Sequence, residues 1–468
     1  MLRITQSLIL LVIIALVAIL PGFSFMPQFI SYHDGLRLLE LLILALVLVS
    51  CIIGGTFDVR PLLPNKLAGF STFLILALGS LSAFYAKSPR HAAIEVSVFV
   101  GLFYLALFIA NICFCNKERF AKQVSLVCWA GILVYVVAFY TGYISSYVIN
   151  TPLLWPLPFT GFDNIRSFNQ YQCWSLGLLS FHLLAFDFKK VSTTRWLHLA
   201  LALWWVLLFY SASRGVLLAW AVGVLLTAIV YQQNAWAFLR LQLTNMGLGL
   251  ACYLILFKWL PALFNLTPII TTVMRSTTGD RIELWNQALI LIRQFPLLGA
   301  GPMQYPWYNP TLGHPHNSVL QLAAEWGLPA TILVLLLSSY GLYCWIKKFN
   351  AKTIDTKTPL DKHWVIILFF TIITNAAYSL VDGVIVIPIS QVMMFILLGL
   401  MMGYYGNDNT GVVKTKSRLS QGLALVALAT MLWASMPEVI QGLSGSEKGF
   451  SMGYRAVGPR FWVEVTTE

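Results

Sequence analysis

The sequence predicts an all-α integral membrane protein that crosses the bilayer many times. Of its 468 residues, 58% are hydrophobic and only 10% are charged, and the mean hydropathy is +0.77. Soluble domains have about 45–50% apolar and about 25% charged residues, so this composition excludes a water-soluble globular enzyme. Two patterns add to the prediction. Long apolar runs recur along the chain, and the loops between them differ in positive charge.

A membrane-spanning helix needs about 20 mainly apolar residues, and runs of this kind predict about 12–13 transmembrane helices. They lie near residues 5–22, 37–54, 67–85, 92–114, 123–143, 171–186, 196–212, 215–231, 243–261, 317–346, 364–381, 387–405 and 420–436. The first run follows Arg3 but has no small-residue cleavage site before Pro21, so we interpret it as a retained span.

The positive charges predict which side of the membrane each loop faces. If the N-terminus lies in the cytoplasm and the loops alternate, 18 Lys and Arg residues fall in the inner loops and five in the short outer loops. This excess is the positive-inside signal of membrane proteins. The loops, together with contact to anionic lipids, account for the net charge of +12, and we expect no nucleic-acid partner.

One long loop, residues 257–316, falls on the predicted outer side and contains an amphipathic helix. The apolar positions of that helix recur at helical spacing: Ile282, Trp285, Leu289 and Ile292. Asp280 is placed to cap its N-terminus, and Glu283 follows at the distance of a capping box. Pro296 and the glycine-rich turn after it end the helix. We expect this helix to lie flat in the outer membrane interface.

Three arginines on the predicted outer side are functional candidates. Arg281 begins the amphipathic helix, where free backbone N–H groups favour a phosphate. Arg214 lies in a tight turn between two apolar spans, and Arg166 precedes another span. The alternative roles are a solvated or lipid-contacting Arg281, an Arg214 that reaches toward the headgroups, and an Arg166 that anchors the interface or pairs with Asp163.

His316 is the candidate for a general base, because imidazole titrates near neutral pH and can take a proton from a hydroxyl group. It stands with Asn317 where the long loop meets an apolar span, and the alternative is a His that caps the following helix. Glu325, about two turns further on, is a candidate supporting carboxylate, and Asp382 near an outer turn is a weaker one. His314 and His316 lack a third ligand at convincing spacing, so we expect no metal.

Several motifs of nucleotide and hydrolase chemistry are missing. The sequence has no phosphate-binding P-loop, no GxSxG, no CxxCH, and no acidic pair on a predicted outer loop of the kind that binds a divalent ion. We therefore expect a reaction whose donor is already activated in the membrane, with no cofactor.

The chemistry-bearing segments also resemble a known family. They are Ser213-Arg214-Gly215, Gly279-Asp280-Arg281 with Trp285, the turn 296–301, and His316-Asn317 followed by Glu325-Trp326-Gly327. In order, spacing and shared side of the membrane they resemble the O-antigen ligase superfamily. That superfamily comprises lipopolysaccharide O-antigen ligases, bacterial protein O-oligosaccharyltransferases (pilin glycosylation ligases) and Wzy polymerases.

The resemblance is clearest over residues 205–345, which include the periplasmic loop 257–316. We expect N-terminal transmembrane helices over 1–204, C-terminal transmembrane helices over 346–436, and a periplasmic tail at 437–468.

The resemblance implies a metal-independent, inverting glycosyl transfer on the periplasmic side of a bacterial inner membrane. The donor it implies is a glycan on undecaprenyl pyrophosphate. Carried onto this chain, Arg214 and Arg281 bind the donor pyrophosphate, with Arg166 as a loose match, and His316 acts on the acceptor hydroxyl. Asp280, Asn317 and Glu325 are possible supporting residues.

Several functions stay open at this stage. The segment 164–172 looks more like the pilin-ligase branch, so we expect transfer to a Ser or Thr hydroxyl of a pilin-like protein. The alternatives are transfer to lipid A–core, a Wzy-type polymerase, a flippase or transporter for a lipid-linked glycan, and a non-catalytic assembly factor. The notable charges cluster at one face rather than at mid-membrane, which favours an enzyme over a transporter.

The predicted sidedness can be tested by cysteine labelling. In a cysteine-free background, Thr311→Cys should react with an impermeant maleimide added from outside the inner membrane, whereas Lys352→Cys should not. The reason is the excess of positive charge in the loops that include Lys352. The reverse labelling pattern would contradict both the topology and a periplasmic site.

Overall fold

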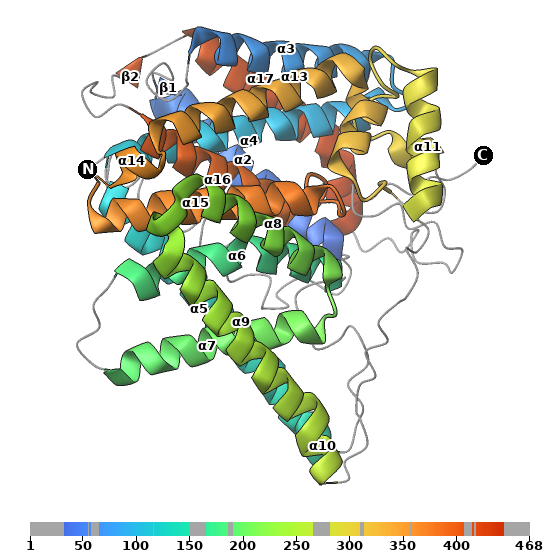
Figure 1. Ribbon diagram of the computed structural model, residues 1–468. Helices are drawn as coiled ribbons and strands as arrows, with labels where there is room; N and C mark the ends of the chain where they lie inside the picture. Colours follow the sequence, from blue (N-terminus) through green and yellow to red (C-terminus); the bar gives the residue numbers. More distant parts are fainter. Residues whose placement is uncertain are drawn as a thin grey trace. The chain divides into compact units, whose positions relative to one another are not determined.

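A computed structural model describes most of the chain. The described residues are 32–54, 56–57, 65–115, 117–149, 165–185, 191–264, 281–308, 313–355, 357–406, 414–415 and 418–443. They are almost entirely helical, which confirms the all-α prediction (Figure 1). The chain forms two units, each assembled from segments that are distant in the sequence.

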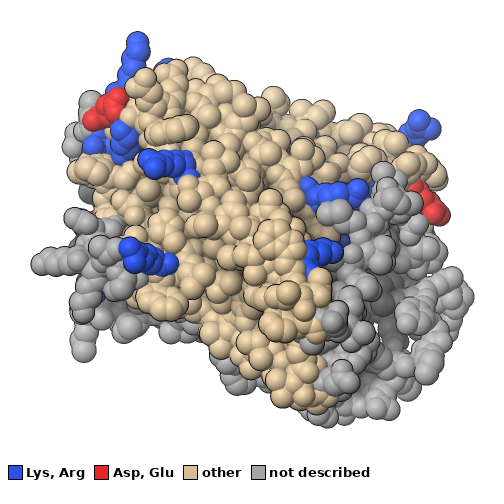
Figure 2. Space-filling model, turned by 60° about the horizontal axis from the view of Figure 1, so that its bottom comes forward, with Lys and Arg blue, Asp and Glu red and all other residues tan. Residues whose placement is uncertain are grey.

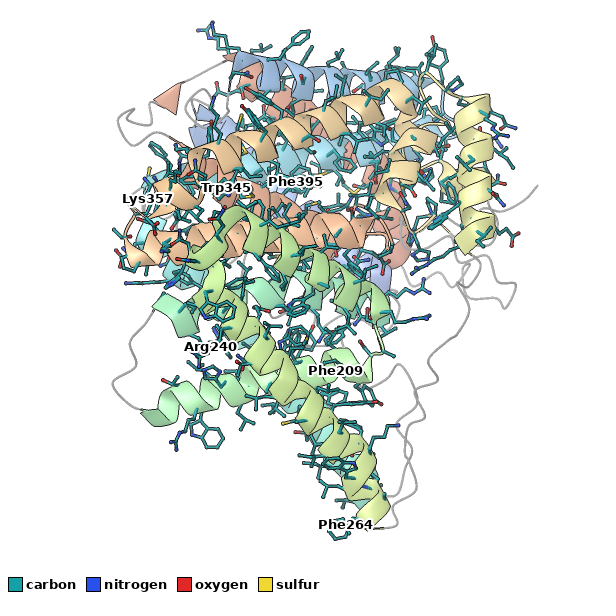
Figure 3. All side chains as sticks on the ribbon, in the orientation of Figure 1. Phe209, Arg240, Phe264, Trp345, Lys357 and Phe395 are labelled. Atoms are coloured by element: carbon teal, nitrogen blue, oxygen red, sulfur yellow. The ribbon has the colours of Figure 1, made fainter. Side chains whose placement is uncertain are left out.

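The first unit contains the middle of the chain and the segment 349–378. Its described elements are α5 (Lys117–Ile149, from Glu118 on), α6 (Ile165–Ala185), α7 (Val191–Tyr210), α8 (Arg214–Tyr231), the 3₁₀ turn η2 (Gln232–Ala235), α9 (Trp236–Leu254), the π-helical turn η3 (Ile255–Trp259), α10 (Leu260–Leu263), α14 (Ala351–Ile354) and α15 (Pro359–Ser379). Helices α7 and α9 pack together, and Phe209 of α7 faces Tyr253 of α9 with 6.2 Å between ring centroids (Figure 3).

Helix α6 is the buried centre of the first unit. Its side chains from Ser167 to Phe181 are all buried, including amides and hydroxyls. Buried polar groups must be hydrogen-bonded in apolar surroundings, and these amides contact neighbouring helices. Gln172 donates to the Trp204 carbonyl at 3.2 Å, and Gln242 of α9 donates to the Leu176 carbonyl at 2.9 Å. These bonds fix how α7 and α9 pack around α6.

The second unit contains the remaining described helices. They are α2 (Tyr32–Gly54), α3 (Lys66–Phe84), α4 (Pro89–Cys115), α11 (Arg281–Gln294), α12 (Tyr305–Tyr308), α13 (Ser318–Lys348), α16 (Pro388–Tyr405) and α17 (Arg418–Leu443). Helix α11 packs on α13 and runs across it rather than along it (Figure 1). Two very short antiparallel strands, β1 (Thr56–Phe57) and β2 (Lys414–Thr415), pair near the ends of α2 and α17; the sequence did not predict them.

Helices α4 and α16 pack closely against each other in the second unit. Gly399 and Gly403 lie four residues apart on α16, so they share one face. A Cβ atom at Gly399 would lie 2.5 Å from the Ala106 carbonyl oxygen, and one at Gly403 would lie 2.7 Å from that of Ala110. Small residues at this spacing let two helix backbones approach closely, as in membrane helix pairs. Beside them, Phe395 packs edge-on against Phe99 of α4 (Figure 3).

Nine of the described helices or continuous helical runs are long and apolar enough to cross a membrane. The chain is therefore a multi-pass membrane protein. The nine candidate spans are fewer than the 12–13 expected from the sequence, for the following reasons. The predicted span 5–22 lies outside the described residues. The span at 171–186 falls in α6, whose buried amides and hydroxyls lower its hydropathy. The span at 196–212 corresponds to a shorter apolar helix, Thr194–Tyr210.

The predicted spans 215–231 and 243–261 lie in one continuous helical run, Arg214–Leu263. Within it, Gln232 has a left-handed φ of +50° between α8 and α9, and the two helices are inclined to each other (Figure 1). The last predicted span extends to Leu443 as α17, and the tail beyond it lies outside the described residues. Most of the surface visible in Figure 2 is uncharged, as expected for helices in contact with lipid.

The α4–α16 contact predicts a strong effect of added volume. Gly403→Leu should lower the melting temperature in detergent, because overpacking of a fitted contact costs about 1–3 kcal/mol. Gly422→Leu on α17 is the matched control, since no neighbouring atom lies within 4 Å of its added Cβ. Equal melting temperatures of the two variants would contradict the proposed packing role.

Candidate active site

Helix α13 is broken at Gly327, and the break holds the turn that follows α11. Gly327 has φ +83°, so the helix does not continue through it and the carbonyls before it need other donors. The Ala324 carbonyl accepts from the Ala300 N–H at 2.8 Å, and the Glu325 carbonyl accepts from the Gly301 N–H at 3.1 Å. In return, the Leu328 N–H donates to the Pro296 carbonyl at 2.9 Å. The predicted glycine-rich turn is thus docked on the break.

Two glycines make this docking possible. A Cβ atom at Gly299, which has φ +71°, would lie 2.3 Å from the Glu325 carbonyl carbon. At Gly79 of α3, a Cβ atom would lie 2.0 Å from the Trp326 ring. The Ser82 hydroxyl, one turn further along α3, donates to the Leu298 carbonyl at 2.5 Å. Helix α3 therefore holds both the turn and the break from one side.

Glu325 is fully buried and anchors the loop that continues from this turn. One carboxylate oxygen accepts from the Tyr305 backbone N–H at 2.8 Å, and the Tyr305 hydroxyl donates to the Leu284 carbonyl of α11 at 2.8 Å. These contacts hold α12 against α11 and α13. A supporting role of Glu325 toward His316 or an arginine stays a prediction.

Helix α11 begins at Arg281, as predicted, and a face other than the predicted apolar stripe packs inward. The buried positions are Leu284, Ala288 and Leu291, which pack on α13, whereas Ile282 is 60% exposed and Leu289 is 42% exposed. The helix has apolar residues on two faces, and tertiary packing selects one of them for the interior. That the other stripe lies in the outer membrane interface stays a prediction. The second face stays open to the surroundings. Asp280, the expected N-cap, lies outside the described residues.

A hydrogen bond joins α11 to the loop that carries the candidate base. The Trp285 indole N–H donates to the Pro315 carbonyl at 3.0 Å, one residue before His316. Arg281 lies one turn before Trp285 and is half-buried. The first turn of α11, which contains Arg281, is therefore held next to the His316 loop.

His316 has a strained backbone and a carboxylate partner. It lies in the left-handed region with φ +52°, and it is 7% exposed. Its Nδ1 atom lies 3.3 Å from Oδ1 of Asp382, a residue in the turn between α15 and α16. Its backbone N–H donates to Nδ1 of His314 at 3.2 Å. The two imidazole rings pack edge-on, with 4.1 Å between their centroids. A non-glycine residue in this conformation is unusual, and such strain is often found at functional sites.

The arrangement around His316 is that of an oriented base. A carboxylate at Nδ1 favours the tautomer that carries its proton there, which leaves Nε2 as the proton acceptor. The same Asp382 oxygen accepts from the Gly383 N–H at 2.7 Å, which fixes the carboxylate. Asp382 was only a weak candidate from the sequence. The signal that could have found it is an Asp-Gly pair between two apolar spans on the predicted outer side.

Asn317 caps α13 and also holds the α15–α16 turn. Its side-chain oxygen accepts from the Val319 and Leu320 N–H groups at 3.0 Å, as an N-cap residue does. Its side-chain nitrogen donates to the Leu380 carbonyl at 3.0 Å, two residues before Asp382. One side chain thus sets the start of α13 relative to the turn that carries the carboxylate.

The other two candidate arginines belong to the first unit. Arg166 is in the first turn of α6, and Arg214 begins α8. The Asn169 side chain donates to the Ser211 hydroxyl at 2.8 Å, which joins the first turn of α6 to the turn before Arg214. Ala212 in that turn has φ +52°. The structure thus gathers Arg166 and Arg214 at one end of their unit, and His316, Asn317, Arg281 and Asp382 in the other unit.

Metal ligation is not indicated by the geometry that the structure describes. Within the described ranges, no group of three or more His, Cys, Asp or Glu side chains is arranged to hold a metal ion. The absence of a metal requirement stays a prediction about the reaction.

A comparison with known protein families gives a match over the central part of the chain. Residues 199–335 match the family described as O-antigen ligase. This segment includes Arg214, Arg281, His316, Asn317 and Glu325, and ends before Asp382. Comparison with curated proteins gives no match.

The double role of Asn317 predicts an order of stabilities. Asn317→Ala removes the cap and the bond to Leu380, and the cap alone is worth about 1 kcal/mol. Asn317→Asp keeps the accepting oxygen but loses the donor, so it should melt between the wild type and the alanine variant. Melting temperatures measured in detergent test this order. Asn350→Ala, which removes the cap of the short α14, is the control and should cost less than Asn317→Ala.

Proposed function

We propose that this chain, whose residues 199–335 match the O-antigen ligase family, belongs to the O-antigen ligase superfamily and transfers an oligosaccharide from undecaprenyl pyrophosphate to a hydroxyl group on the periplasmic side of a bacterial inner membrane. The family match supports a glycan-transferring enzyme in general. The single observation that carries the proposed mechanism is the His316–Asp382 pair, because it is a base with an oriented proton-accepting nitrogen.

The proposed reaction is a direct displacement. The acceptor oxygen bonds to the anomeric carbon of the donor glycan while the bond from that carbon to the pyrophosphate oxygen breaks. Nε2 of His316 takes the hydroxyl proton, and undecaprenyl pyrophosphate leaves with the electron pair. Attack from the face opposite the leaving group inverts the anomeric centre.

In this proposal the arginines bind and stabilise the pyrophosphate leaving group. Arg281 starts α11, where its guanidinium and the free N–H groups of the first turn favour the same anion. Arg214 starts α8 in the same manner, and Arg166 lies in the first turn of α6. Guanidinium groups placed where negative charge develops stabilise the transition state electrostatically, so no metal ion is required for this step.

The proposed acceptor is a Ser or Thr hydroxyl of a pilin-like protein. Its support is the segment 164–172, which resembles the pilin-ligase branch. The matched family description favours a second candidate, the lipid A–core sugar. Both acceptors offer a hydroxyl group to His316, so the catalytic residues do not distinguish them.

A reconstituted assay tests the function. Purified protein in liposomes receives an undecaprenyl-pyrophosphate glycan together with a pilin-like protein or lipid A–core, and mass spectrometry identifies the product. Glycosylated pilin supports the proposal, and glycosylated lipid A–core supports the second candidate. Translocation of the donor without transfer to either acceptor would indicate a flippase and overturn the proposal.

The mechanism predicts severe losses in this assay. Arg214→Ala and Arg281→Ala should each lower kcat by about 100- to 1,000-fold, the usual effect of removing one preorganised charge-stabilising group. His316→Ala should lower kcat by about 100- to 10,000-fold, the usual contribution of a general base. Lys at 214 or 281 should restore only part of the rate, because an ammonium cannot make the bidentate contact of a guanidinium. Protein levels in the membrane should stay normal. Near-normal transfer by Arg281→Ala would contradict its assigned role.

The reaction should also survive metal removal. After exhaustive treatment with EDTA we expect an unchanged rate, because arginines supply the electrostatic stabilisation that a divalent ion gives elsewhere. Loss of activity that one divalent ion restores would show that the reaction needs a metal.

A further inference from the structure

A buried ion pair on α2 has no part in the proposed reaction. Arg37 and Glu40 are each 1% exposed and form a hydrogen-bonded ion pair. Charges inside a membrane protein are costly, and a buried pair is weak support for stability because desolvation offsets the attraction. Such residues in membrane helices usually serve a function. The Arg37 guanidinium has further hydrogen-bond partners besides Glu40.

The guanidinium and its neighbour hold the end of the α15–α16 turn. Arg37 donates from Nη1 to the Gln391 side-chain oxygen at 2.8 Å and from Nη2 to the Val386 carbonyl at 3.0 Å. Gln391 in turn donates from Nε2 to the Ile385 carbonyl at 2.8 Å. Two successive carbonyls of the turn are thus bound to side chains that the α2 ion pair fixes in place.

The turn transmits this restraint to Asp382. The N–H groups of Val386 and Ile387 both donate to the Gly383 carbonyl, at 3.0 and 3.1 Å. The Gly383 N–H donates to the Asp382 carboxylate, which faces Nδ1 of His316. A continuous series of contacts therefore runs from Arg37 to His316 within the second unit. The start of the turn is held separately, by Asn317 at the Leu380 carbonyl.

Neighbouring atoms surround the α15–α16 turn closely, so a shift of its backbone would displace other residues. A Cβ atom at Gly383 would lie 2.4 Å from the His314 ring, and His314 accepts the backbone N–H of His316. A displaced turn would therefore move the carboxylate away from His316 and disturb the residue that supports its backbone.

We infer that Arg37 is a positioning residue for glycosyl transfer, acting through the α15–α16 turn to keep the Asp382 carboxylate at Nδ1 of His316. This inference rests on the proposed function. Arginine suits the role because its rigid planar fork donates to Glu40, Gln391 and Val386 at fixed angles. A lysine at this position keeps the charge but not that geometry.

The test uses the full-length protein in the reconstituted transfer assay. Arg37→Met/Glu40→Met removes both charges together, so that neither is left buried alone. We expect kcat per folded protein to fall by about 10- to 100-fold, the range for a misplacement of about 1 Å at a reacting group. The KM for the donor should stay within about twofold, because the donor arginines are untouched. Arg37→Lys should restore only part of the rate.

Gln391→Met is a milder variant on the same network, in case the double variant does not fold. Gln242→Met is its matched control. Both glutamines are 1% exposed and bonded to a backbone carbonyl, but Gln242 contacts Leu176, Ser180 and Trp220 of the first unit. Gln391→Met should lower kcat per folded protein, and Gln242→Met should affect the folded amount only.

A double-mutant cycle separates positioning from general stability. If Arg37 acts through Asp382, adding Arg37→Met/Glu40→Met to Asp382→Asn should lower kcat by less than about threefold further, because the shared interaction is already lost. A fully multiplicative loss, or an unchanged kcat in the Arg37 and Gln391 variants, would overturn the inference. An inactive wild type would instead refute the proposed function.

Discussion

The backbone of α13 imposes the constraint on which the candidate site depends. Gly327 interrupts the hydrogen-bond ladder of a long apolar helix, and the freed carbonyls of Ala324 and Glu325 must find donors. A buried carbonyl without a partner is costly in an apolar medium, so the turn 296–301 has to dock there. Once it is docked, the position of α11 follows, because the helix ends directly before the turn.

The end of the second unit that carries the candidate site is thus assembled by backbone groups rather than by apolar contacts alone. The turn binds α13, Glu325 binds the Tyr305 N–H, and Trp285 binds the Pro315 carbonyl. Each of these bonds has a defined direction, whereas apolar contacts tolerate sliding. Directional bonds suit a site in which a base and an anion-binding helix terminus must keep a fixed geometry.

The α15–α16 turn brings together residues from three distant parts of the sequence. Asn317 holds one end of it, Arg37 and Gln391 hold the other, and Asp382 lies between them. Rigid support on both sides explains how His316 can keep a left-handed backbone that costs about 1–3 kcal/mol. The proposed base is therefore supported by the transmembrane helices around it and not by its loop alone.

The sequence by itself determined the membrane class, the helical fold, most spans and the residues of the O-antigen ligase segment. Apolar run length and the 3.6-residue period are local properties, and the turn after Pro296 is marked by its own glycines. The break at Gly327 was not predicted, because a single glycine is tolerated within a helix and the span 317–346 was expected to be continuous. Arg281 at a helix start was visible for the same reason, since the signals of a helix start involve neighbours in sequence. The cap of α13 was not visible: the sequence suggested His316 as a possible cap, whereas the structure shows Asn317 in that place.

Only the tertiary structure decided which face of α11 packs inward, because Ile282 and Leu284 are both apolar and the choice depends on α13. It also decided that Asp382, 66 residues beyond His316, is the partner of the His316 imidazole, and that Arg37 contacts its turn. A hydrogen bond between distant segments leaves no periodicity in either one. Pairs of this kind depend on how the helices pack against one another, and the residue pattern of a single sequence does not show that packing.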